Sequence, residues 1–121
     1  MAKKRRIALS PASKAVTAER AARVYRLLKL LSTGPHTRSV LTRRLRLDVR
    51  GFYRDLELLR EAGIDVELQR RRYTLTESLA GTVARLPFPD PHLTIGEASQ
   101  LAKGRGPVHR KIKLLLKSIV S

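Results

Sequence analysis

The 121-residue chain contains no cysteine and no tryptophan. Without cysteine, disulfide bonds and metal sites that depend on thiolates are excluded. No apolar run approaches the roughly 20 residues that a membrane-spanning helix needs, and the basic N-terminus is not followed by the apolar segment of a signal peptide. From these absences we expect a soluble protein of the cytoplasm that has no membrane span.

Aromatic residues are also few, with three tyrosines and two phenylalanines. Proteins that bind RNA or single-stranded DNA stack the bases on exposed aromatic rings. Because Phe52 is needed in the apolar interior, too few rings remain for such a platform. The sequence therefore disfavours this class of nucleic-acid binding.

The three histidines, His36, His92 and His109, each stand near a proline or in a linker. None is spaced from another histidine or from a carboxylate as metal ligands and catalytic pairs are. The sequence Asp90-Pro91-His92 is more typical of a turn than of a catalytic pair. We therefore expect a protein that is not an enzyme, with no catalytic residue, no metal, no cofactor and no small-molecule site.

Acidic residues are few: the chain has 10 aspartates and glutamates and 26 lysines and arginines, which gives a net charge of +16. Residues 1–76 hold 19 basic and 7 acidic side chains, a net +12, whereas residues 77–121 hold 7 and 3, a net +4. Such a charge destabilises the folded state by self-repulsion unless an anion screens it. The composition indicates nucleic acid or an acidic membrane surface as the partner, bound by the first half.

Residues 1–16 are expected to form a flexible basic arm, because adjacent like charges without carboxylates repel one another. Such an arm can follow phosphates or a minor groove, or it can simply be a solubilising terminus. Its expected phosphate contacts are Lys3, Lys4, Arg5 and Arg6.

Helix-capping residues mark two helices after the arm. Thr17 predicts a helix over 18–31 that ends at Gly34-Pro35, because glycine permits a left-handed cap and proline cannot continue the helix. A start at Ser10 is an alternative. A second predicted helix covers 38–45 and is capped by Thr37. Its expected buried residues are Val40, Leu41 and Leu45, and Arg38 is an expected phosphate contact.

A third helix is predicted over 48–63, with one buried and one exposed face. Asp48 is a suitable cap because its carboxylate accepts bonds from the first backbone N–H groups. Phe52, Leu56 and Leu59 recur at helical spacing and predict the buried stripe. The exposed face carries the candidates for base contacts, Val49, Arg50, Tyr53 and Arg54.

Arginines on this face have two interpretations. Guanidinium forks can bond bidentately to guanine or to phosphate in a major groove, but amphipathic helices commonly expose arginines only to solvent. Asp55 lies at the edge of the buried stripe. We expect it to pair with an arginine such as Arg43 or Arg44 and to fix the helix structurally, rather than to contact a base.

Residues 64–68 alternate apolar and polar side chains, and the alternation resumes at Tyr73 and Leu75, which predicts a β-hairpin. Its tip carries three arginines that repel one another without a partner. This favours phosphate contacts over a plain solvated turn. The expected contacts are Arg70, Arg71 and Arg72.

The remainder of the chain divides into a linker over 77–93, punctuated by glycine and prolines, and a two-helix extension over 94–121. Thr94 and Glu97 form a capping-box pattern that opens the first helix. The stripe predicted for the last helix is Val108, Ile112, Leu115 and Ile119. Helices this short must pack on the preceding domain or on a second copy of the chain.

Residues 41–56 align without a gap to the pattern L-A-x-x-L-x-V-S-x-R-T-I-x-R-D-L. The chain thereby resembles the N-terminal winged helix-turn-helix region of bacterial transcription regulators that carry a WYL ligand-sensing domain. The likeness extends over about 17–103, including Arg72-Tyr73-Thr74-Leu75 and the capping box. The matching positions are Leu41, Leu45, Leu47, Arg50, Phe52, Arg54, Asp55 and Leu56.

The chain departs from that pattern in several places. Gly51 stands where threonine is common, Arg46 where a turn glycine is common, and Arg71 and Arg72 where the wing strand has glycines. These changes put sequence preference in doubt, although each arginine adds phosphate affinity. The chain ends at Ser121, so nothing corresponds to the sensor body and truncation before it is expected.

Together these features predict a mainly α fold with a small β-hairpin, a winged helix-turn-helix over 17–76 followed by a short helical extension. The resemblance implies a sequence-specific regulator of transcription in the bacterial nucleoid that binds double-stranded DNA, expected as a homodimer. The alternative is a helical adaptor that binds a protein partner or an acidic membrane through its basic C-terminal helix.

Overall fold

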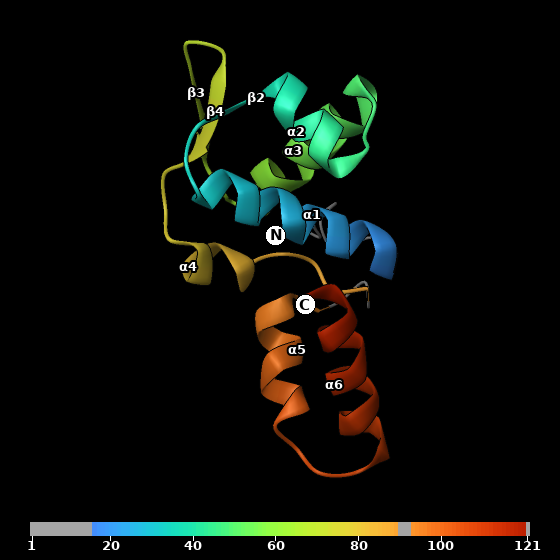
Figure 1. The fold of residues 1–121 in the computed structure, drawn as a ribbon. Coiled ribbons are helices and arrows are strands. Elements are labelled where there is room, and N and C mark those ends of the chain that lie inside the picture. Colours follow the sequence, from blue (N-terminus) through green and yellow to red (C-terminus); the bar gives the residue numbers. More distant parts are fainter. Residues whose placement is uncertain (1–15, 90–92, 121) are drawn as a thin grey trace, which may run out of the picture.

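The computed structural model describes residues 16–89 and 93–120. Helices dominate, and a small antiparallel sheet lies at one end of the molecule (Figure 1). The mainly helical fold with a small hairpin is thus confirmed. The elements are α1 (Ala18–Ser32), β2 (His36–Thr37), α2 (Arg38–Leu45), α3 (Val49–Glu61), β3 (Val66–Gln69), β4 (Arg72–Leu75), α4 (Leu79–Val83), α5 (Ile95–Ala102) and α6 (Pro107–Ile119).

The first three helices begin directly after the capping residues that the sequence indicated. The Thr17 hydroxyl accepts a bond from the Arg20 backbone N–H at 3.0 Å, and Thr37 caps α2 in the same way. Asp48 Oδ1 accepts from the Gly51 N–H at 2.7 Å. These bonds satisfy N–H groups that have no partner within a helix. The alternative start at Ser10 lies outside the described residues.

The sheet contains a strand that the sequence pattern did not reveal. Strand β4 lies between β2 and β3 and is antiparallel to both. Opposite β4, His36 and Thr37 pair with Tyr73 and Arg72. The hairpin is therefore hydrogen-bonded to the segment between α1 and α2. Its alternation is imperfect, because Tyr73 is buried whereas Leu68 is 55% exposed.

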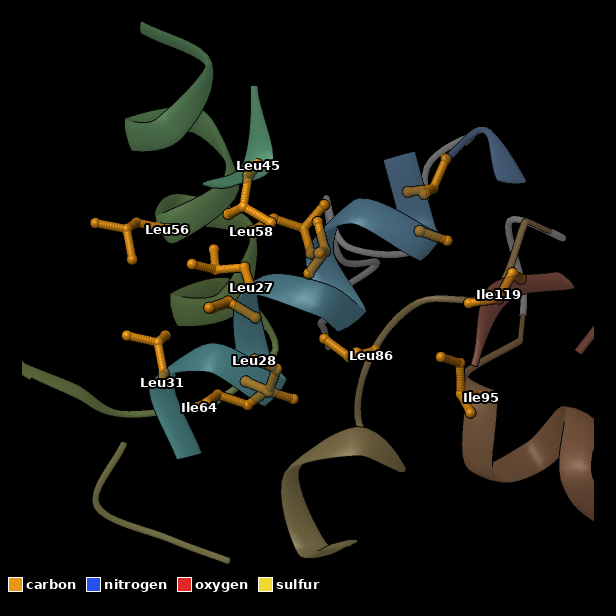
Figure 2. Packing of buried hydrophobic residues seen from close by; sticks show 14 of the residues in the cluster. Leu27, Leu28, Leu31, Leu45, Leu56, Leu58, Ile64, Leu86, Ile95 and Ile119 are labelled. Atoms are coloured by element: carbon orange, nitrogen blue, oxygen red, sulfur yellow. The ribbon is translucent and has the colours of Figure 1, made fainter. Parts of the chain in front are cut away.

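Helix α1 lies between two groups of elements, with α2, α3 and the sheet on one side and α4, α5 and α6 on the other (Figure 1). Its apolar side chains belong to one continuous cluster that reaches both groups (Figure 2). On α2, Val40 is only half-buried, in contrast to the sequence expectation. The α1 residues in the core are Ala21, Val24, Leu27, Leu28 and Leu31.

The expected linker over 77–93 is instead largely ordered, a difference from the sequence expectation. It contains α4, and both Leu86 and Phe88 are buried in the core. The Arg85 guanidinium donates to the Gly63 carbonyl at 2.7 Å and pairs with Glu77. The bond to Gly63 attaches the segment to the turn after α3. The segment is also ordered because its apolar side chains, which separate the prolines, need burial.

The extension packs on α1 of the same chain, within the same core. The capping box of α5 is confirmed, with Thr94 and Glu97 bonding each other's backbone N–H groups at 3.1 and 2.9 Å. The stripe predicted for α6 is wrong at Val108, which is 66% exposed, whereas Leu116 is buried. Helix α6 is thus rotated so that Leu116 and Ile119 face the core.

Candidate nucleic-acid interface

Helix α3 has a buried back and a charged front. Phe52, Leu56 and Leu59 are buried, and Leu58 joins them although the sequence stripe did not include it. The four side chains named as base contacts are exposed, with Val49 at 47% and Tyr53 at 45%. The front therefore offers hydrogen-bond donors on a helix whose rotation is fixed by its packing.

The turn between α2 and α3 brings further arginines to the start of that front. The backbone of Arg46 adopts the left-handed conformation, with φ 56°, and its N–H donates to the Arg43 carbonyl at 3.3 Å. The next N–H, of Leu47, bonds to the Thr42 carbonyl at 2.9 Å. Arg43, Arg44 and Arg46 are exposed, and the sequence indicated a general phosphate affinity only for Arg46 and a defined contact for none of the three. Their closeness in sequence to Arg50 was the available signal.

Asp55 pairs with arginines, as expected, but with Arg20 and Arg23 of α1 instead of the suggested Arg43 or Arg44. The carboxylate is fully buried and accepts from Arg23 Nε at 2.8 Å, Arg23 Nη2 at 3.1 Å and Arg20 Nε at 3.1 Å. This bidentate bond raises the pKa of Arg23. Because Asp55 points toward α1, it cannot face an α2 residue, and it fastens α3 to the central helix.

Arg38 connects the start of α2 to the front of α3. Its Nη1 donates to Tyr53 Oη at 3.0 Å, and its guanidinium carbon lies 5.9 Å from the ring centroid. The hydrogen bond from Arg38 lowers the pKa of Tyr53, because it favours the phenolate. Burial raises the pKa of the neighbouring Tyr73. Phe52 packs edge-on against both tyrosine rings, at 5.4 and 5.2 Å between centroids.

The hairpin tip holds Arg70 and Arg71 in left-handed conformations, with φ 52° and 67°. Two consecutive positive φ values fit the tight hairpin turn that normally selects asparagine and glycine. Arg71 lines a hollow of about 450 Å³ together with Arg38, Tyr73 and the start of α2. Arg70 and Arg72 line a different hollow of about 400 Å³. The structure thus brings Arg71 near Arg38 but places the other two tip arginines on another side.

Comparisons of the chain with protein-family models, with curated proteins and with solved structures found no match.

The chemistry of this surface is therefore inferred from its side chains. Within residues 16–89 and 93–120, no group of three or more histidine, aspartate or glutamate side chains is placed to hold a metal ion. No helix in that part of the chain is long and apolar enough to cross a membrane. The predicted contacts Lys3, Lys4, Arg5 and Arg6 lie outside the described residues. What remains is a surface of guanidinium donors, suited to phosphates and base edges.

Proposed function

We propose that the protein binds double-stranded DNA as a winged helix-turn-helix regulator of transcription in the bacterial nucleoid. In this proposal α2 and α3 are the helix-turn-helix, α3 enters the major groove, and the β3–β4 hairpin is the wing. Arg50 and Arg54 bond to base edges, with Val49 and Tyr53 beside them. The resemblance to the DNA-binding region of WYL-domain regulators supports the same proposal.

One observation carries this proposal: a continuous line of donors joins the front of α3 to the wing. Tyr53 is bonded to Arg38, and Arg38 shares a hollow with Arg71. A duplex lying along this line would meet base-reading side chains on α3 and phosphate-binding side chains on α2 and the wing. Major-groove readers need this combination, since phosphate contacts fix the register in which base contacts specify sequence.

The anchoring of α3 also supports the proposal. Base discrimination requires donors held in a fixed orientation, because a mobile helix would accept several bases equally well. Buried Phe52 and the Asp55 ion pairs oppose both rotation and sliding of α3. The front of the helix is thus presented by a rigid support rather than by a loop.

Selection of bound duplexes from a random pool tests the proposal directly. We expect enrichment of a defined motif, and two inverted half-sites if the regulator acts as a homodimer. If about 6 phosphates are neutralised, affinity should fall roughly a thousandfold between 50 and 200 mM salt. Recovery of unrelated duplexes with no common motif would leave only general DNA binding, and no binding at low salt would reject the proposal.

A further inference from the structure

A further basic hollow lies at the α5–α6 turn, at the end of the molecule opposite the hairpin tip (Figure 1). Its volume is about 620 Å³. Four basic side chains line this hollow, two from the turn and two from α6, and all four are exposed. We call these four residues the distal basic surface: Lys103, Arg105, Arg110 and Lys113.

No carboxylate neutralises this surface from within its own segment. Residues 98–120 contain six lysines and arginines and no aspartate or glutamate. The nearest acidic residue in sequence, Glu97, is engaged in capping α5. Among the ion pairs found in the described part of the chain, none includes a residue of the distal basic surface. Such unpaired like charges gather counter-ions, and a polyanion would relieve their repulsion.

The shape of the turn is fixed rather than loose. His109 Nδ1 lies 2.7 Å from the Leu101 carbonyl oxygen, which can only accept, so Nδ1 carries the hydrogen and donates it. A Cβ atom at Gly104 would lie 2.6 Å from the same ring, so only glycine allows this approach. The histidine ring therefore holds the end of α5 against the start of α6 and keeps the cations around the hollow.

The lining favours phosphates over lipid chains. Apart from Ala102, the residues that line the hollow itself are polar, charged or glycine, and the exposed apolar side chains of α5 and α6, Leu101, Val108 and Leu114, lie outside its lining. Membrane-binding helices place apolar side chains beside their cations, so that these enter the lipid. Lysines and arginines around a polar hollow instead match the regularly spaced phosphates of a nucleic-acid backbone.

We propose that the distal basic surface binds the backbone of a second DNA duplex, so that one chain bridges two duplexes. The inference rests on the proposed function for the first duplex, held by α3 and the wing. The hairpin and the α5–α6 turn lie at opposite ends of the molecule (Figure 1), so the two duplexes would contact different ends of the chain. The second contact reads no base, since it involves phosphates alone.

A bridging assay tests this inference on the whole chain. One duplex that contains the selected motif is fixed to beads, and capture of a second, fluorescent duplex is measured. The distal variant carries Lys103→Gln, Arg105→Gln, Arg110→Gln and Lys113→Gln. We expect it to bind the bead duplex but to capture about tenfold less of the fluorescent duplex, because four phosphate contacts are lost.

A matched control separates the position of the charges from their number. Arg26→Gln, Lys29→Gln, Lys111→Gln and Lys117→Gln remove four exposed cations outside the hollow and leave the same net charge. This control should bridge as the unmodified chain does. Thermal unfolding and binding to the bead duplex show that both variants fold. Equal loss of bridging in both variants would overturn the inference, since charge number alone would explain it.

The remaining outcomes are distinct. Unchanged bridging by the distal variant overturns the inference and leaves the proposed function intact, as happens if a dimer bridges through two copies of α3. Failure of the unmodified chain to bind the bead duplex overturns the proposed function instead. Binding to phosphatidylserine vesicles that is lost in the distal variant, without any bridging, would assign the surface to a membrane and reject the second duplex.

Discussion

Arg23 on α1 holds the buried carboxylate of Asp55 on α3 through two hydrogen bonds, of 2.8 and 3.1 Å. The two residues are 32 positions apart, and Arg20 adds a third bond to the same carboxylate. Breaking a buried pair leaves a charge without a partner, which costs about 3–5 kcal/mol. Together with the buried apolar side chains of α3, this contact fixes the orientation of that helix.

Removal of both arginines should therefore destabilise the fold. We expect Arg20→Ala with Arg23→Ala to lower the free energy of unfolding by about 3 kcal/mol, and Arg23→Ala alone by less, because Arg20 still pairs with Asp55. Urea denaturation measures both values. Arg26→Ala, an exposed neighbour on α1, is the control and should change stability by less than about 0.5 kcal/mol. A double variant as stable as this control would contradict the structural role.

The two proposed classes of DNA contact, to bases and to phosphates, should respond differently to substitution. Arg50→Ala should reduce discrimination between the selected motif and random duplex by about 1–3 kcal/mol, whereas Arg71→Ala should weaken both equally. Binding isotherms on the two duplexes measure this. Arg50→Lys keeps the charge but loses the fork, so it should resemble Arg50→Ala in specificity. Equal losses on both duplexes for Arg50→Ala would show that Arg50 reads no base.

The strained turn between β3 and β4 should show opposite effects of substitution on stability and on binding. Arg70→Asn with Arg71→Gly supplies residues that favour positive φ. The free energy of unfolding should therefore rise by about 1–2 kcal/mol. Duplex affinity should nevertheless fall, since two cations are removed. Thermal unfolding and binding titrations measure the two effects. Arg70→Lys with Arg71→Lys retains both charge and strain, and a gain in stability for this pair would exclude relief of strain as the cause.

The tyrosines around Arg38 should titrate in a defined order. Because Arg38 lowers the pKa of Tyr53 and burial raises that of Tyr73, Tyr53 should ionise at the lower pH. Arg38→Ala should move the Tyr53 pKa upward, toward the ordinary value of 10.0. NMR of labelled tyrosine rings follows each residue. With Arg44→Ala as the control, an unchanged Tyr53 titration in Arg38→Ala would rule out the hydrogen bond as the cause.

The extension should unfold together with the rest of the chain, because one apolar core includes both. Ile119 is 2% exposed, and Ile119→Ala should cost about 2–4 kcal/mol. Leu114→Ala, at a side chain that is 67% exposed, is the control and should cost little. Chemical denaturation monitored by two spectroscopic probes gives the result. Two separate transitions, with only one shifted by Ile119→Ala, would show that the extension is an independent unit.

Features encoded locally could be predicted from the sequence, and those set by distant partners could not. Each capping side chain, of Thr17, Thr37 and Asp48, accepts a bond from a backbone N–H three residues later. The first residue of each of these helices could therefore be predicted from the local sequence. The partner of Asp55 comes from another helix, and nothing near it in sequence identifies Arg20 or Arg23. Their spacing of three, which puts both on one face of α1, was the available signal.

Two further differences have the same physical origin. Strand β2 has two residues and no alternation to detect, since its pairing with β4 alone defines it. In α6 the run Leu114-Leu115-Leu116 permits several buried faces, and packing against α1 selects the one that contains Leu116. In the candidate interface, the exposed face of α3 followed from helical spacing, but the nearness of Arg38 to Tyr53 and Arg71 required the folded sheet.

Thr37 is both the last residue of β2 and the cap of α2. No linker residue separates the sheet from the helix. A displacement of the hairpin should therefore also move the first turn of α2, which contains Arg38. A single residue inserted after Thr37 would uncouple the two and rotate α2 by about a quarter of a turn. If the hairpin and α2 bind a DNA backbone as proposed, a shift of one should therefore be passed to the other through Thr37.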